Sequence, residues 1–546
     1  MKLRLRWNSP KNWLHIGWLL AFFLLALFGR IWAGAPDSSF GAFEDVPAHL
    51  VSASAARTWL ADMGLHPPIG FLENYYASFP KVAVGQWPPM LHGFLGLFTL
   101  LPGVSPWSML LGSCALAALS AFGVRLLARD NLPVPLPGIL GAAFLSLPLV
   151  QRLSGVPMTE LLVAAFGTLG VMQYTRYLRT GDASKAITYG LCTLAAVFTK
   201  GSGLAMIAVA LLAPLLAGRP GRWITRGTLG AGAIVGVFGF AWYFVTMKFS
   251  QSTWAGNSGG SIPYWQAAAA FYGRDLLTEL GSVLIALAAI GQVFLFTHEN
   301  FRDLGATSLA WLLGLTACAL FLPTGIEARH LVPAMPVILV LAGVGALEVW
   351  RVMGFFPSQR VLPAAAILSL GVVLQAFAPA RAEYSGFREA VGHAFRTPDL
   401  RRAPWLVASD ALGEGLLVSE ANLQHPEPEG IQVLRASKVL ASDSWVGEGY
   451  HLLMTRPEEV RAYLSEHTIA AVFIDRSMGR VHWQPHVDLL LEAVEGDGAP
   501  FVLEDRLDVI RDGVRYPGGL WLYRQVGLDG QPVQWMDYRE VRPEAR

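Results

Sequence analysis

The sequence predicts an α-helical polytopic membrane protein of about eleven spans, followed by a C-terminal soluble α/β domain. One reason is the distribution of charge: residues 1–380 contain only 37 charged side chains, whereas residues 381–546 contain 44, a frequency typical of a soluble domain. The other is a series of apolar runs that is confined to the first part. Together these observations exclude a single soluble globule, a disordered chain and a nucleic-acid-binding protein with a basic face.

The first span is predicted at about 14–33, directly after a basic segment with Lys2, Arg4, Arg6 and Lys11. Its length of about 20 residues is enough to cross roughly 30 Å of hydrocarbon. A cleaved signal peptide has a similar start, but the length of this run and the runs after it favour a retained span. Further spans are predicted near 107–127, 136–151, 160–175, 185–199, 202–217, 228–247, 280–297, 306–322, 331–348 and 361–379.

Basic residues predict how the protein is oriented. Residues 1–380 carry a net charge of +9 and residues 381–546 a net charge of −8. With a cytoplasmic N-terminus, fifteen of the 23 basic residues of the first part fall in cytoplasmic segments, as the positive-inside rule expects. An odd number of spans then places the C-terminal domain outside, in the periplasm if the membrane is a bacterial inner membrane. The remaining basic residues indicate an anionic ligand on the outer face; they are Arg30, Arg57, Lys81, Arg152, Lys200, Lys248, Arg274 and Arg329.

The chain divides into a membrane domain at 1–380, with a large outer loop at 34–106, and an extracytoplasmic domain at 381–546. The outer loop contains an amphipathic piece from Pro47 to Met63 and a short apolar run from Pro89 to Leu101, which predict helices lying in the membrane interface. A second outer segment, 248–279, opens with a Gly/Ser-rich run and is expected to continue as a helix.

Short β-like runs alternate with helical patterns in the tail, which predicts an α/β domain. The tail contains no cysteine, nucleotide-binding loop or nucleophile motif, and therefore folds without disulfides. The predicted strands are Trp405–Ala408, Gly415–Ser419, Ile431–Arg435, Ala470–Asp475 and Leu520–Tyr523. The predicted helices are Pro457–His467 and His486–Val494.

Two acids follow the first span. Glu44 and Asp45 are adjacent, and His49 comes four residues after Asp45. A carboxylate at the membrane surface can take a proton from an attacking hydroxyl, and the three side chains together suit a divalent metal. The alternative is structural: Asp45 stands just before Pro47 and could cap the helix that follows.

Three cations are candidates for binding a phosphate. Lys200 stands between two short apolar runs, where a charge is costly without a partner. Arg329, next to His330, could bind a phosphate through two nitrogens, or simply pair with Glu327 at the membrane surface. Lys81 could also contact a phosphate, although extension toward lipid headgroups is the commoner role of such a lysine.

These features together resemble a family, the membrane glycosyltransferases of the C superfamily (GT-C), in particular the protein mannosyltransferase and aminoarabinose transferase group. The resemblance covers residues 1–380. It rests on the acidic pair after the first span, an interfacial loop ending in Pro88-Pro89, Thr199-Lys200-Gly201 between short helices, and Arg329-His330-Leu331-Val332-Pro333 followed by Pro336.

The resemblance implies inverting transfer of a sugar from a polyprenyl-phosphate donor to a lipid, glycan or protein acceptor. In the family the aspartate of the first loop is the catalytic base, and the match here is Asp45. The usual order is Asp-Glu, whereas this chain has Glu44 before Asp45. Many members also have lysine directly before Pro-Pro, where this chain has Trp87, so that Lys81 fills that place only if the loop folds back.

On this interpretation Asp45 and Glu44 are catalytic, and Lys200, Arg329, Lys81 and His330 bind the donor phosphate. No cofactor is required, although a divalent metal could assist. Partners are the donor, the acceptor and membrane lipids, and no nucleic acid.

Two other functions remain open. A transporter or lipid flippase also uses broken helices and membrane charges. A membrane-anchored binding protein would instead act through its tail.

Overall fold

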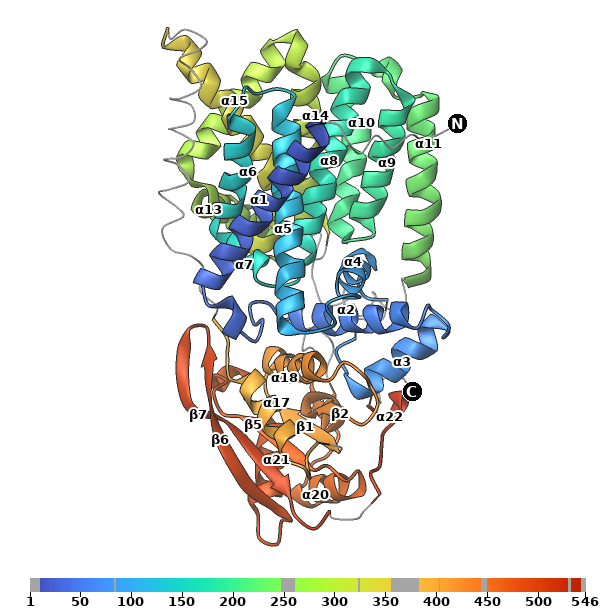
Figure 1. Ribbon diagram of the computed structural model, residues 1–546, viewed down its shortest axis with the longest axis vertical. Helices are drawn as coiled ribbons and strands as arrows, with labels where there is room; N and C mark the ends of the chain where they lie inside the picture. The colour runs from blue at the N-terminus through green and yellow to red at the C-terminus, as the bar shows by residue number, and fades with distance from the viewer. Residues whose placement is uncertain are drawn as a thin grey trace.

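The computed structural model describes residues 10–82, 85–246, 261–322, 325–354, 383–401, 403–442, 449–528 and 532–541. Figure 1 shows three parts along the long axis: a bundle of long helices, a layer of helices lying across one end of that bundle, and a C-terminal α/β domain beneath the layer. The predicted helical membrane bundle and the predicted C-terminal α/β region are both present.

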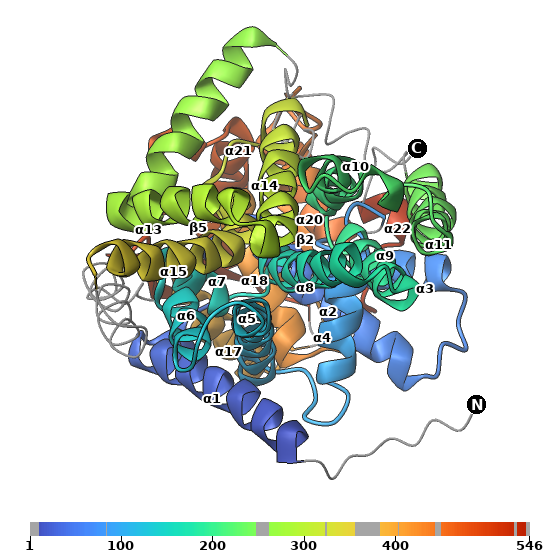
Figure 2. The same ribbon diagram turned by 90° about the horizontal axis from the view of Figure 1, so that it is seen from above.

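The bundle is built from helices that run along the long axis, with α1 at its periphery against α5 and α6 (Figure 2). Its longer helices are α1 (Pro10–Trp32), α5 (Pro106–Arg129), α8 (Thr159–Thr180), α13 (Ile262–Thr297), α14 (Arg302–Phe321) and α15 (Met335–Val352). Its shorter ones are α6 (Leu136–Ser146), α7 (Pro148–Ser154), α9 (Ala183–Val197), α10 (Met206–Leu216) and α11 (Arg226–Ile234). Single turns lie at η1 (Ala35–Asp37), η2 (Gly201–Ala205), η3 (Pro220–Arg222), η4 (Val235–Gly239), η5 (Glu299–Phe301) and η6 (Ala328–Ala334).

Among the described residues, six helices are long and apolar enough to cross a membrane, or seven if the bent pair α6–α7 counts as one span. The predicted run 160–175 lies in α8, and the runs 185–199 and 202–217 form shorter helices. The run 361–379 lies outside the described residues. The helix predicted to follow the Gly/Ser-rich run of the segment 248–279 begins at Ile262 and is continuous with the span at 280–297, except for a break at Gly281, whose φ is +72°.

Two glycines set the distance between α13 and α15. A Cβ atom on Gly345 would lie 1.9 Å from the Leu287 carbonyl oxygen, and one on Gly291 would lie 2.0 Å from that of Leu341. The two helix backbones are therefore in direct contact, as small residues permit in membrane bundles. This contact places η6, which leads into α15, at the end of the bundle.

The layer across the end of the bundle contains α2 (Val46–Ala61), α3 (Pro68–Ser78) and α4 (Met90–Phe98) (Figure 1). For the first of these the sequence predicted an amphipathic piece, which has one polar face and one apolar face. Instead, every residue from 46 to 55 is buried, because α2 packs between α4 and α18 of the C-terminal domain.

The C-terminal domain is centred on a five-stranded sheet with strand order β2-β1-β5-β7-β6, in which β2, β1 and β5 are parallel. The strands are β1 (Pro404–Ala408), β2 (Gln432–Arg435), β5 (Ala471–Asp475), β6 (Phe501–Arg511) and β7 (Val514–Gln525), and a separate pair is β3 (Ala441–Ser442) with β4 (His451–Leu452). The helices are α17 (Phe387–Arg396), α18 (Ala411–Gln424), α19 (Ala436–Val439), α20 (Pro457–Glu466), α21 (Pro485–Glu495) and α22 (Tyr538–Val541), with the turn η8 (Arg480–His482).

Four of the five predicted strands are present, as are both predicted helices. The prediction of a strand at Gly415–Ser419 is wrong, since these residues lie within α18. Asp410 begins that helix by accepting a hydrogen bond from the Gly413 amide at 2.7 Å. Residues 413–423 are all buried, and a fully buried helix has no polar face by which its sequence can be told from a buried strand.

The C-terminal domain is hydrogen-bonded to the first outer loop. Arg388 donates to the carbonyl oxygens of Pro36 and Ser38, each at 2.6 Å. Tyr75 of α3 donates to the Pro426 carbonyl at 2.7 Å and accepts from the Asn422 amide at the same distance. These bonds hold the loop that carries Asp45 against α18.

The α13–α15 contact leads to a prediction. Gly345→Ala should lower the free energy of unfolding by about 1–3 kcal/mol, because the added methyl group must displace a carbonyl oxygen. Gly273→Ala is the matched control, since a Cβ atom there meets no atom within 4 Å. Thermal unfolding in detergent should show a lower midpoint for the first variant only. Equal midpoints for the two variants would contradict the close packing.

Candidate functional site

Asp45 stands at the start of α2, in the position of an N-cap residue, but its side chain does not cap the helix. Its Oδ2 atom instead accepts a hydrogen bond of 2.7 Å from Nη2 of Arg329. The capping alternative is therefore not what the structure contains. The carboxylate of the first loop is directed at a residue 284 positions later in the chain.

Arg329 lies in η6, the turn that leads into α15, and its side chain is 7% exposed. The same Nη2 atom that binds Asp45 donates to Oε1 of Glu327 at 2.6 Å. Nε of Arg329 lies 3.7 Å from Oε1 of Glu160, and the guanidinium stands 5.1 Å from the ring centre of Phe43. The predicted pairing with Glu327 is thus present, as one of three contacts between Arg329 and carboxylates.

Lys200 has a buried partner, Glu160, the second residue of α8. The lysine Nζ donates to Oε1 of Glu160 at 2.5 Å, and the carboxylate is 1% exposed. Lys200 stands in the short break between α9 and η2. Gly203 makes this break compact, because a Cβ atom there would lie 2.3 Å from the backbone of Ala196.

Asp45, Arg329, Glu160 and Lys200 therefore form one network in which carboxylates and cations alternate. Each buried charge has an opposite charge within 4 Å, which offsets the cost of removing both from water. The two predicted phosphate-binding cations and the predicted base come together, although they originate from three separate segments.

The electrostatic state of Asp45 follows from its surroundings. Burial by itself would raise the pKa of Asp45, but the charge and hydrogen bond of Arg329, together with the charges of His49 and Lys200, lower the pKa below the ordinary value. The carboxylate is therefore ionised at neutral pH. While Arg329 remains in contact, Asp45 is a weak base.

Lys81 is 3% exposed and lies at the junction of the loop and the C-terminal domain. A Cβ atom on Gly415 of α18 would lie 2.8 Å from Cε of Lys81 and 3.0 Å from Pro47. The alternative role for Lys81, extension toward lipid headgroups, is not what the structure contains, because α18 covers the side chain. Burial lowers the pKa of Lys81 to about 7; Arg435 contributes to this shift, and Asp45 opposes it.

His49 does not form a metal site with the two acids. Its Nδ1 atom lies 3.0 Å from Nε2 of His92, and burial lowers the pKa of His49 to about 4. Among the described residues, no three or more His, Cys, Asp and Glu side chains are arranged to hold a metal ion. The suggested set of Glu44, Asp45 and His49 fails because Asp45 is turned toward Arg329 and His49 toward His92.

Two other predicted residues lie at the margin of the network. Glu44 is exposed and makes no side-chain hydrogen bond or ion pair with the rest of the described chain. His330 follows Arg329, and its Nδ1 atom is 3.0 Å from the hydroxyl of Tyr272. Of the two, His330 is the one held in a fixed orientation.

Sequence reasoning missed two residues of this region. Glu160 begins a predicted span, and a carboxylate at that position was itself a signal, since acids in spans are paired or functional. Tyr243, in the helix Arg226–Thr246, lies beside Gly201: its hydroxyl is 3.5 Å from a Cβ atom built on that glycine. That hydroxyl is buried and has no hydrogen-bond partner among the described residues, which no sequence pattern could predict.

No family model matches the sequence, and no curated protein matches it either. Solved structures do match. ArnT from Cupriavidus metallidurans bound to undecaprenyl phosphate has a TM-score of 0.57 at 12% identity, over 96% of this chain and 100% of that one. The oligosaccharyltransferase of Archaeoglobus fulgidus has a TM-score of 0.53 at 11% identity, over 87% of this chain and 71% of that one.

Arabinofuranosyltransferase AftD from Mycobacteria has a TM-score of 0.50 at 14% identity, over 94% of this chain and 40% of that one. At these identities the similarity establishes the fold. The similar structures are polytopic membrane glycosyltransferases with a soluble domain. The chain therefore has the fold of the GT-C membrane glycosyltransferases.

Proposed function

We propose that the protein transfers a sugar from a polyprenyl-phosphate donor to a hydroxyl of a lipid, glycan or protein acceptor, with inversion and with Asp45 as general base. The observation that carries this proposal is the buried network in which Asp45 meets Arg329 and, through Glu160, Lys200. A base and two phosphate-binding cations in one place are the groups that this reaction requires. ArnT, which has the same fold, is described as binding undecaprenyl phosphate.

In the proposed reaction the acceptor oxygen attacks the anomeric carbon from the face opposite the phosphate. The new carbon–oxygen bond forms as the bond to the phosphate oxygen breaks, and the acceptor proton passes to Asp45. The polyprenyl phosphate leaves with the bonding electron pair. Arg329 and Lys200 stabilise the negative charge that grows on it, with Lys81 and His330 as further contacts.

Arg329 gives this mechanism an order of events. In the structure its Nη2 atom is bound to Asp45, which lowers the pKa of the base. A donor phosphate competes for the same guanidinium. Binding of the donor therefore releases Asp45 from part of its ion pair and makes the carboxylate a stronger base when the substrate is in place.

No step is routed through a metal ion. Asp45 and Glu160 each already bind a cationic side chain, and His49 is bonded to His92.

We further propose the placement in the cell: a bacterial inner membrane, a cytoplasmic N-terminus, a membrane domain at 1–380 and a periplasmic domain at 381–546.

A lipid flippase is the second candidate. It is favoured by the 73° bend between α6 and α7 and by the break at Gly281, since interrupted helices form the binding sites of many transporters. A flippase needs no base, so the first variant below distinguishes the two functions.

Asp45→Asn should leave the protein folded and inserted but reduce sugar transfer by at least about 100-fold, because the base is lost. Asp62→Asn, at the exposed far end of α2, is the control and should retain activity. The assay compares membranes of a gene-deletion strain complemented with each variant, and follows labelled sugar from polyprenyl-phosphate donors into the glycan, lipid or protein that loses it on deletion. Full transfer by Asp45→Asn would rule out Asp45 as the base.

Arg329→Lys should weaken binding of undecaprenyl phosphate about tenfold, because lysine keeps the charge but cannot hold a phosphate through two nitrogens. Arg274→Lys, at a side chain that is 71% exposed, should bind like the parent protein. Affinity is measured by titration of the purified protein in detergent. Equal affinities for the two variants would remove Arg329 from the donor site.

We propose that the buried hydroxyl of Tyr243, beside Gly201, donates a hydrogen bond to the donor phosphate. Tyr243→Phe removes this hydroxyl and should weaken binding of undecaprenyl phosphate by about three- to tenfold. Tyr174→Phe is the control, since that hydroxyl already donates to the Ala210 carbonyl. If Tyr243→Phe changes stability but not affinity in the same titration, Tyr243 is structural.

A further inference from the structure

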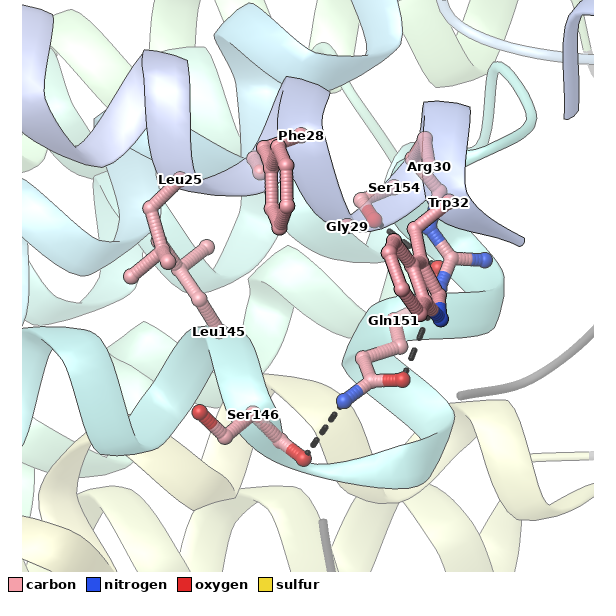
Figure 3. Close-up of a pocket in the computed structure, with 10 residues that line it drawn as sticks. Leu25, Phe28, Gly29, Arg30, Trp32, Leu145, Ser146, Gln151 and Ser154 are labelled. Atoms are coloured by element: carbon pink, nitrogen blue, oxygen red, sulfur yellow. Dashed lines mark hydrogen bonds between the residues drawn. The ribbon is translucent and has the colours of Figure 1, made fainter. Parts of the chain in front are cut away.

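A cavity of about 410 Å³ lies between the end of α1 and the break that separates α6 from α7 (Figure 3). From α1 it is lined by Leu25, Phe28, Gly29, Arg30 and Trp32, and from the other two helices by residues that include Gln151 and Ser154. None of the residues assigned above to sugar transfer lines it. The cavity therefore needs a separate explanation.

The break between α6 and α7 creates this space. Leu147 is extended, with φ −63° and ψ 134°, and Pro148 begins α7 at 73° to α6. Gln151 stabilises the break by donating to the Ser146 carbonyl at 3.0 Å (Figure 3). On the opposite wall Gly29 has no side chain, and a Cβ atom there would meet nothing within 4 Å.

The walls of the cavity change from apolar to basic along α1. Leu25 and Phe28 are 44% and 64% exposed, which on a peripheral helix of the bundle means exposed to lipid. One turn further on, Arg30 is 4% exposed, and its Nη2 atom donates to Oε1 of Gln151 at 3.5 Å. Figure 3 shows the guanidinium of Arg30 beside the side chain of Gln151.

Trp32 fixes the depth of this basic end in the membrane. It is 73% exposed at the last residue of α1, and tryptophans gather where hydrocarbon meets headgroups. This end of α1 is the one nearer the C-terminal domain (Figure 1). Arg30 therefore stands at the depth of lipid phosphates in that leaflet, while Leu25 and Phe28 stand at the depth of acyl chains.

We propose that the cleft binds one anionic phospholipid of that leaflet. Its phosphate contacts Arg30 and Gln151, and the first part of an acyl chain lies along Leu25 and Phe28. Basic pockets between membrane helices bind acidic headgroups in this way. Among the described residues that line the cleft, Arg30 carries the only formal charge, and there is no carboxylate to hold the ammonium group of a zwitterionic lipid. An anionic headgroup such as phosphatidylglycerol is therefore the complementary one.

The experiment measures lipid binding to the full-length, delipidated protein by native mass spectrometry. Phosphatidylglycerol should bind at one site at least tenfold more tightly than phosphatidylcholine. Gly29→Leu should abolish that site, because the new side chain fills the cavity while Arg30 remains. Gly17→Leu, in the same helix and with equally open space around it, should bind phosphatidylglycerol like the parent protein.

A second variant separates charge from shape. Arg30→Gln should remove the preference for phosphatidylglycerol over phosphatidylcholine. Unchanged phosphatidylglycerol binding in Gly29→Leu, or an equal affinity of the parent protein for the two lipids, would overturn the proposal. So would displacement of phosphatidylglycerol by undecaprenyl phosphate, since the cleft would then belong to the donor. None of these outcomes bears on the role of Asp45.

Discussion

The ion pair between Asp45 and Arg329 is the interaction on which the arrangement of this protein depends. It joins the first outer loop to the turn before α15, and Arg329 also reaches Glu160 at the start of α8. These segments would otherwise present isolated charges at the end of an apolar bundle, each at a cost of several kcal/mol. With them paired, α2 can lie flat across the bundle, and the C-terminal domain can dock on α2.

The same pairing explains how four charged side chains can lie together in a largely buried site. A network of alternating charges is stable only if every member keeps a partner, so an entering phosphate must replace a carboxylate rather than add to the set. In the proposed mechanism, this exchange links binding of the donor phosphate to the release of Asp45 from Arg329.

The sequence was sufficient for much of this picture. The apolar runs and the uneven distribution of charge along the chain predicted the bundle and the α/β tail. Asp45, Lys200 and Arg329 were identified because a charged side chain next to a membrane span is costly unless it has a partner or a ligand. Glu160 was not predicted as a site residue because it is the first residue of the apolar run 160–175, which was interpreted only as a span. The strand predicted at Gly415–Ser419 was wrong because a helix buried on all sides has no periodic pattern. The buried hydroxyl of Tyr243 depends on packing between distant helices, which periodicity does not encode.

The contact between Gly415 of α18 and Lys81 couples the position of the C-terminal domain to the protonation of a buried lysine. Lys81 is held between Pro47 of α2 and Gly415 of α18, and its pKa of about 7 places its charge in balance near neutral pH. Any movement of α18 changes the burial of Lys81 and hence its proton occupancy. Linkage is reciprocal, so protonating Lys81 must in turn alter the free energy with which the soluble domain docks on the membrane bundle. Protonation of Lys81 and docking of the C-terminal domain on the bundle are therefore thermodynamically coupled.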